Sequence, residues 1–247
     1  MVTRDEAVAR ADAWVNGDAA PADRIEVGVF DFEDGYVVWG VDPEPADTTR
    51  PPETVGSARG VIDRESGELS IWPPLPVPVV AAQYSAKRQA QARFPEDVLE
   101  VLRAAGWRPG RDVSGDVARW MEHARTLETD SGEPLLLFPA ARTALDEFGG
   151  LRIEATGKYP FSFHPTDHEP DYELYEGLAE ILGKQVFPIG VRHDDGPSEL
   201  TIDTDGRVFA SHWSGSYFVG PTLDAAITTL VRGVGNTLPQ VMADGTF

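Results

Sequence analysis

Cysteine is missing from this chain of 247 residues. Its absence excludes disulfide bonds, thiolate metal ligands and thiol nucleophiles, and it fits a reducing compartment. Long apolar runs are missing too, because residues 71–82 are interrupted by four prolines and are too short to cross a bilayer. The first twenty residues carry charges throughout and lack the apolar stretch of a secretory signal. We therefore predict a soluble, cytoplasmic protein that does not bind membranes.

Basic residues are scarce, with 21 Lys and Arg against 41 Asp and Glu, which gives a net charge of −20. Residues 1–92 and residues 93–247 are both acidic, so the charge is not confined to one tail. Such a chain repels nucleic acid and anionic membrane surfaces, and we expect no direct binding to nucleic acid. It attracts a basic protein partner, although solubility alone also explains an acidic surface.

Catalytic motifs are lacking as well. The sequence contains no nucleophile elbow, no Walker loop and no dinucleotide-binding fingerprint. Gly157-Lys158 resembles the end of a phosphate loop, but Arg152 stands where that motif requires glycine. His164 and His168 are spaced like a helical metal pair, but Pro165 argues against a helix there. We predict no metal, no other cofactor and no enzymatic activity.

The central stretch, residues 145–151, predicts a sharp corner in the chain. Pro139 suits the first turn of a helix, and apolar residues follow it at helical spacing up to Phe148. Gly149 and Gly150 come next, where a left-handed residue ends helices without steric cost. Residues 151–155 then alternate like a half-buried strand, so we predict a helix turned onto a strand.

The patterns on either side of this corner predict an α+β fold with two tandem domains. In residues 1–78 a capping box at Thr3 starts a helix that reaches about Asn16, and two hairpins follow. Gly35 is predicted to be left-handed in the first hairpin. Residues 79–93 form a linker or connecting helix. Residues 94–247 form a second domain, a sheet packed with helices, in which residues 161–170 are expected to be a loop.

Two features are candidates for a partner-binding surface. On the helix predicted over residues 172–182, glutamates follow a helical spacing while Tyr175, Leu178 and Leu182 point the other way. An ordinary solvated face is the alternative. Trp213 and Tyr217 lie in a Gly/Ser-rich segment, whereas the other tryptophans fall where helices and strands bury them. The candidate partner-binding residues are Glu169, Glu173, Glu176, Glu180, Asp194, Asp195, Trp213 and Tyr217.

Several short motifs between Phe94 and Gly233 occur in a consistent order. They are Ala105-Gly106-Trp107-x-Pro109-Gly110-Arg111, Leu145-x-x-Phe148-Gly149-Gly150-Leu151, Phe163-x-Pro165, Leu182-Gly183, Pro188-Ile189-Gly190 and Ile202-Asp203-x-x-Gly206-Arg207-Val208. In these motifs the second half resembles the third branch of the SUKH superfamily, the Smi1-like immunity proteins. The first half resembles the YrhB-like immunity domain in Gly35-Tyr36-Val37-Val38-Trp39 and Val61-Ile62-Asp63-Arg64-x-x-Gly67-Glu68.

The resemblance implies a protein that neutralises a polymorphic toxin by binding it. Toxins of such systems are often nucleases or nucleic-acid deaminases, and a basic toxin suits the acidic chain. The motif positions are mostly Gly, Pro or apolar, so the resemblance transfers a scaffold and no catalytic residue. The leading interpretation is therefore an immunity protein that binds its toxin stoichiometrically. The alternative is a regulatory scaffold that recruits an endogenous partner, as some SUKH relatives do.

Overall fold

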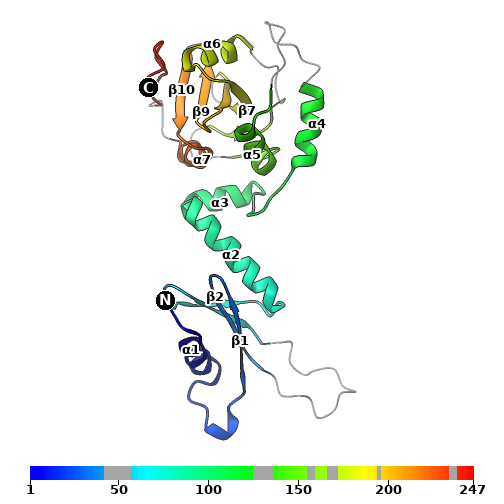
Figure 1. The fold of residues 1–247 in the computed structure, drawn as a ribbon, viewed down its shortest axis with the longest axis vertical. Helices are drawn as coiled ribbons and strands as arrows, with labels where there is room; N and C mark the ends of the chain where they lie inside the picture. The colour runs from blue at the N-terminus through cyan, green and yellow to red at the C-terminus, as the bar shows by residue number, and fades with distance from the viewer. Residues whose placement is uncertain (42–56, 125–135, 155–158, 166–171, 194–195, 234–237) are drawn as a thin grey trace. The chain divides into compact units, whose positions relative to one another are not determined.

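The computed structural model describes residues 1–41, 57–124, 136–154, 159–165, 172–193, 196–233 and 238–247. The chain divides into two compact units, residues 1–89 (unit 1) and residues 90–247 (unit 2). Each unit combines helices with an antiparallel sheet (Figure 1), which confirms the predicted α+β class. The sequence predicted domains at residues 1–78 and 94–247, with residues 79–93 between them. That these two segments fold independently remains a prediction.

Unit 1 is a four-stranded antiparallel sheet with helices on its faces. The strands follow one another in the order β1-β2-β3-β4. Its elements are α1 (Arg4–Asn16), a short 3₁₀ turn (Pro21–Asp23), β1 (Val27–Phe32), β2 (Gly35–Gly40), β3 (Arg59–Asp63), β4 (Leu69–Trp72) and the first part of α2 (Val77–Arg93).

Helix α1 begins and ends where the sequence predicts. The Glu6 backbone N–H donates to the Thr3 hydroxyl, and the Glu6 carboxylate accepts from the Thr3 backbone N–H at 2.8 Å, which completes the capping box. Gly17 closes the helix. Ala7 and Ala11 face the sheet and are fully buried, and their small size lets the helix approach it closely.

The two faces of this sheet are covered by different helices. Tyr36, Val38 and Ile62 pack with α1 on one face. Val37 and Val61 pack on the other face with the start of α2, which contributes residues such as Val80. The sequence predicted only one helix on this sheet. The second helix follows a run of prolines, and its residues were therefore expected to connect the two domains.

The prediction of a left-handed Gly35 is wrong. Gly35 lies inside β2 and pairs with Phe32 across a two-residue loop. Glycine is required there for a different reason: a Cβ atom would lie 2.2 Å from the carbonyl oxygen of Ile62. The close approach comes from the neighbouring strand β3, which a local turn pattern does not reveal.

Unit 2 is built around a six-stranded antiparallel sheet in the order β10-β9-β8-β7-β6-β5. A short strand lies within residues 161–170, where the sequence predicted only a loop. Besides the end of α2, the elements of unit 2 are α3 (Glu96–Ala104), α4 (Ser114–Ala124), α5 (Pro139–Phe148), β5 (Arg152–Ile153), β6 (Phe161–Ser162), α6 (Tyr172–Leu182), β7 (Val186–Arg192), β8 (Ser198–Asp203), β9 (Val208–His212), β10 (Gly215–Gly220) and α7 (Leu223–Arg232).

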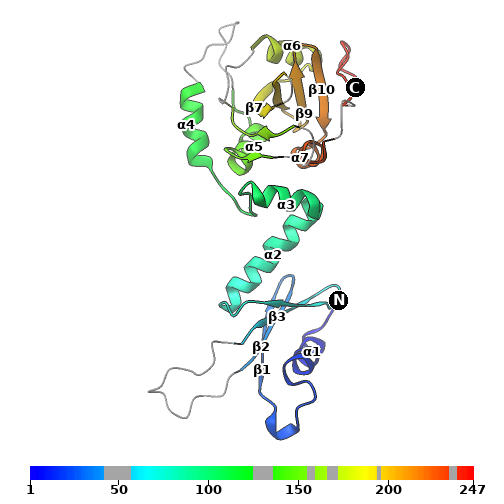
Figure 2. The same ribbon diagram turned by 180° about the vertical axis from the view of Figure 1, so that it is seen from behind.

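Helices cover both faces of this sheet. The main core joins residues of α3, α5 and α7 to one face, on which Leu200 and Ile202 lie. The smaller core joins α6 to the opposite face through Val186 and Phe209. In both views α6 is drawn above the strands of unit 2, and α5 and α7 are drawn below them (Figure 1 and Figure 2).

The predicted corner is the junction between α5 and β5. Pro139 occupies the first turn of α5, and Phe148 at its end is fully buried. Gly150 is left-handed, with φ +76°, and its N–H donates to the Phe163 carbonyl at 2.6 Å. Arg111 donates to the carbonyls of Glu147 and Gly149, the latter at 2.7 Å, and so satisfies acceptors that the helix end leaves unpaired.

The division into two units leads to a first testable prediction. A chain of residues 90–247 contains the complete main core, including Ala90 and Phe94. We expect this fragment to unfold in one cooperative transition, and limited proteolysis of the intact chain between residues 73 and 92 to release a similar fragment. Circular dichroism during urea unfolding measures the first expectation, and mass spectrometry of the digest measures the second. A fragment without a cooperative transition would mean that the two units fold only together.

Candidate partner-binding surface

The structure places the acidic residues of α6 on one exposed face. Tyr175 and Leu178 are buried against the sheet, as the helical spacing predicts. Glu173, Glu176 and Glu180 are exposed on the other side of the helix. We call these three residues the acidic ridge. Like charges at this spacing repel each other by about 0.2–0.5 kcal/mol per pair, so the ridge is not explained by helix stability.

Lys184 is the first basic residue after the acidic ridge in the sequence, and it lies just beyond the end of α6. Lys184 follows Gly183, which is left-handed with φ +61°, and its ammonium group forms an ion pair with Asp205 at 2.8 Å. Lys184 also lowers the pKa of Asp205, chiefly through the hydrogen bond between them. The positive charge of Lys184 is therefore engaged at the β8–β9 turn.

Trp213 occupies the turn between β9 and β10. Its side chain is 84% exposed, which is unusual for so large an aromatic residue. Tyr217 is half-buried in β10, and its hydroxyl lies 3.0 Å from the Ser214 hydroxyl. The structure thus joins Trp213 and Tyr217 in one hairpin, which is a different element from the acidic ridge.

Three predicted partner-binding residues, Glu169, Asp194 and Asp195, lie outside the described residues. His168, the second member of the histidine pair, lies outside them as well. His164 is half-buried, with its ring 4.3 Å from the Trp120 ring. Among the described residues, no group of three or more His, Asp or Glu side chains is arranged to hold a metal ion.

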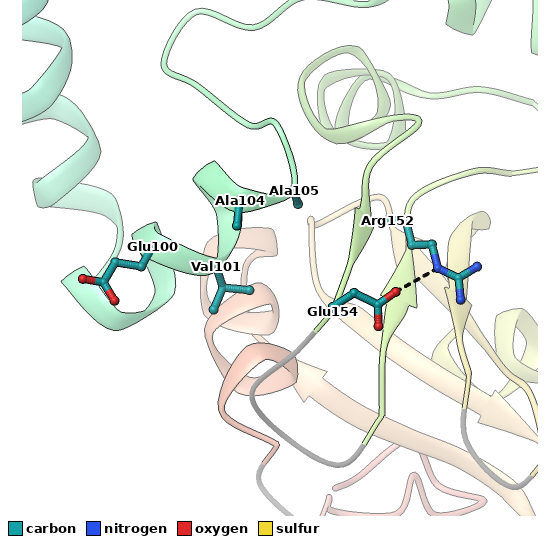
Figure 3. Close-up of a pocket in the computed structure, with 6 residues that line it drawn as sticks. All are labelled: Glu100, Val101, Ala104, Ala105, Arg152 and Glu154. Carbon is teal, nitrogen blue, oxygen red and sulfur yellow. Dashed lines mark hydrogen bonds and ion pairs between the residues drawn. The ribbon is translucent and has the colours of Figure 1, made fainter.

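A hollow between α3 and β5 was not predicted from the sequence. It has a volume of about 330 Å³ (Figure 3). One wall is the flank of α3 and the other is β5 with the residue that follows it. The lining residues are Glu100, Val101, Ala104, Ala105, Arg152 and Glu154. These two walls are about 50 residues apart in the sequence, so only the fold brings them together.

The charged and aromatic residues near the corner stabilise the scaffold. Arg93 forms ion pairs with Glu147 and Asp224, both at 2.7 Å, and its guanidinium group lies over the Phe94 ring. The hydrogen bond to Asp224 is the main cause that raises the pKa of Arg93, although partial burial opposes it. The indole N–H of Trp107 donates to the same Glu147 carboxylate at 3.0 Å. The Trp107 turn and the Phe148-Gly149-Gly150 corner are thus held together, and their residues serve the fold.

Comparison with known protein families agrees with the family resemblance of the sequence motifs. Residues 94–233 match the family model described as SUKH-3 immunity protein, and residues 5–91 match the one described as Immunity protein 35-like domain. No curated protein and no solved structure gave a significant match. Within the described part of the chain, no helix has the length and apolar character needed to span a membrane. The two matches give two immunity domains in tandem, and because the first covers more than half of the chain, the protein belongs to the SUKH-3 immunity protein family.

Proposed function

We propose that this protein neutralises a cognate polymorphic toxin by binding it directly in a stoichiometric complex. Immunity-protein domains generally act on a cognate toxin, and two such domains in one chain are the observation that carries the proposal. The motif positions contribute to the cores, turns and helix ends described above, so they supply a scaffold for binding. The proposed place of action is the cytoplasm, where a toxin of this kind reaches its targets.

The charge of the chain supports a basic toxin that acts on nucleic acid. A nuclease or nucleic-acid deaminase needs a positive surface for its phosphate-bearing substrate. A protein with a net charge of −20 is attracted to that surface and competes with the substrate for it. The proposed contact residues are the acidic ridge with Glu169, the pair Asp194 and Asp195, and the hairpin residues Trp213 and Tyr217.

Co-expression with the toxin domain from the neighbouring gene tests this function. We expect the intact chain to restore growth and to form a complex with a fixed ratio of the two proteins, as measured by light scattering after gel filtration. No protection and no complex would contradict the proposal. Capture of one stoichiometric host protein from a lysate without toxin would instead favour the regulatory scaffold.

The acidic ridge gives the next testable prediction. Changing Glu173, Glu176 and Glu180 to lysine should slow association with the toxin about tenfold or more at low salt, because exposed charges steer encounter. The difference should shrink at ordinary ionic strength, where exposed charges are screened beyond about 8–10 Å. Folding should be preserved, since all three side chains are exposed. Stopped-flow association at two salt concentrations measures the effect.

A control with the same change in net charge separates local from global electrostatics. Glu26, Glu33 and Glu68 are exposed glutamates of unit 1, and their triple change to lysine alters the net charge equally. If both triple variants slow association to the same extent, total charge steers the toxin. If the ridge variant associates as fast as the unmodified chain, the ridge is an ordinary solvated face.

A further inference from the structure

Within the described residues, the sheet of unit 2 has one covered edge and one open edge. At the β10 edge the C-terminal residues add a further strand-like contact: the Phe218 N–H donates to the Pro239 carbonyl, and the Val241 N–H donates to the Ser216 carbonyl, both at 2.8 Å. At the other end β5 is the last strand of the described part of the sheet, where it pairs with β6. Uncovered edges invite pairing with another chain, and natural proteins generally protect them.

The backbone of β5 presents hydrogen-bonding groups at this open edge. The Phe163 N–H donates to the Leu151 carbonyl at 2.9 Å, so Leu151 is directed toward β6. Backbone groups alternate in direction along an antiparallel strand, and the N–H and C=O of Arg152 therefore point away from β6. A strand added at this edge would meet one donor and one acceptor in the correct alternation.

The hollow described above lies beside the same strand. Val101, Ala104 and Ala105 give its α3 wall an apolar lining, while Arg152 and Glu154 form its β5 wall (Figure 3). The Arg152 guanidinium is neutralised by Glu154 at 3.1 Å. Among the described residues none forms an ion pair with Glu100, whose exposed side chain leaves one uncompensated negative charge at the rim.

We propose that β5 and this hollow receive an extended, basic segment of the toxin partner. The segment would add a strand at the β5 edge, and one Lys or Arg side chain would enter the hollow. Its aliphatic stem would lie on Val101, Ala104 and Ala105, as long basic side chains do on apolar surfaces. The identity of the partner rests on the proposed function, whereas the site itself is independent of the acidic ridge.

Charge complementarity favours a basic occupant over an acidic or purely apolar one. The ammonium or guanidinium group would be placed at the rim beside Glu100. Figure 3 shows the Glu100 carboxylate turned away from β5, so the proposed contact requires a change of its side-chain rotamer. An acidic side chain would meet this carboxylate and Glu154, and the net charge of the chain would repel its approach.

Filling the hollow tests the proposal in the intact chain. Ala104 is exposed at the end of α3, so Ala104→Phe should fold normally while occupying the hollow. Ala118→Phe makes the same change on α4, where the alanine is also exposed. We expect Ala104→Phe to weaken toxin binding about tenfold or more, Glu100→Gln to weaken it about threefold, and Ala118→Phe to leave it unchanged. Equal toxin affinity of Ala104→Phe and Ala118→Phe would overturn the proposal while leaving the proposed function intact.

A peptide probe makes the test independent of the toxin. The probe is the capped peptide Thr-Val-Lys-Val-Thr, and its analogue carries norleucine in place of lysine. Titration into the ¹⁵N-labelled intact chain should shift the amide signals of residues 101–105 and 152–154, more strongly with lysine than with norleucine. If the unmodified chain binds no toxin, the proposed function is wrong, and the peptide titration alone then tests the proposed site. Absence of amide shifts in residues 101–105 and 152–154 would overturn that site.

Discussion

Replacing Phe148 with alanine is expected to lower the free energy of unfolding of unit 2 by about 3–5 kcal/mol. The Phe148 ring is fully buried where α5 ends. It stacks on Trp107, with ring centroids 6.1 Å apart and planes at 5°, and it also contacts Phe94 and Phe163. Removing the ring leaves a cavity between three aromatic side chains that are themselves held by other contacts, so the site cannot easily collapse.

Urea unfolding followed by circular dichroism measures this loss. Phe148→Leu conserves most of the volume and should cost less than about 1.5 kcal/mol. Trp213→Ala removes an aromatic side chain that is 84% exposed, and it should change stability by less than about 0.5 kcal/mol. Similar losses for Phe148→Ala and Trp213→Ala would contradict the central place of the corner in this core.

Replacing Asp63 with asparagine is expected to lower the stability of unit 1 by about 2–4 kcal/mol. The Asp63 side chain is 10% exposed at the end of β3. Its carboxylate accepts hydrogen bonds from the Ser66 N–H at 2.8 Å, from the Tyr84 hydroxyl at 2.7 Å and from Arg88 at 2.7 Å. Tyr84 and Arg88 belong to α2, so one carboxylate joins that helix to the β3–β4 turn. The asparagine amide places an NH2 group where the surrounding groups donate hydrogen bonds, and it leaves Arg88 without its buried anionic partner.

The same carboxylate predicts a pH dependence with a definite sign. Burial alone raises the pKa of Asp63, but the hydrogen bonds from Ser66, Tyr84 and Glu65 outweigh burial and lower it to about 2 from a value of 3.8. Because the pKa is lower in the folded state, the ionised group stabilises the fold above about pH 4. This contribution, about 2 kcal/mol, is lost as the pH falls from about 4 to about 2.

Urea unfolding of the unmodified chain and of the Asp63→Asn variant at pH 7, 4 and 3 separates the contribution of Asp63 from those of the other carboxylates. The stability difference between the two should be largest at pH 7 and should shrink at pH 3. Glu68→Gln changes an exposed carboxylate in the same turn, and it should alter stability little at any of these pH values. A difference between the intact chain and Asp63→Asn that does not change with pH would contradict the lowered pKa.

The local patterns of the sequence were sufficient where one helix or turn depends on neighbouring residues alone. The capping box at Thr3, the start of α5 at Pro139 and the two faces of α6 are confirmed in this way. Each depends on backbone geometry or on a helical repeat, and the residues that determine it lie within a few positions of one another.

The predictions that failed are those in which a distant segment decides the outcome. Residues 161–170 contain β6 because Phe161 and Ser162 pair with β5 and β7, and a stretch rich in Pro and His gives no local sign of this pairing. Gly35 is a strand residue because Ile62 approaches it from another strand. In both cases the controlling contact spans many residues along the chain.

The sequence by itself determined the α+β class, most helix ends, the acidic character and the family motifs. Those features follow from composition, from local periodicity and from residues that tolerate only a few backbone conformations. Only the tertiary structure decided that α2 covers the second face of the unit 1 sheet and that α3 forms a hollow beside β5. It also decided that the C-terminal residues cover the β10 edge, while β5 is the outermost strand at the other edge of the described sheet. Strand order and the packing of helices on a sheet result from contacts between residues far apart in the chain. Patterns among neighbouring residues carry no information about those contacts.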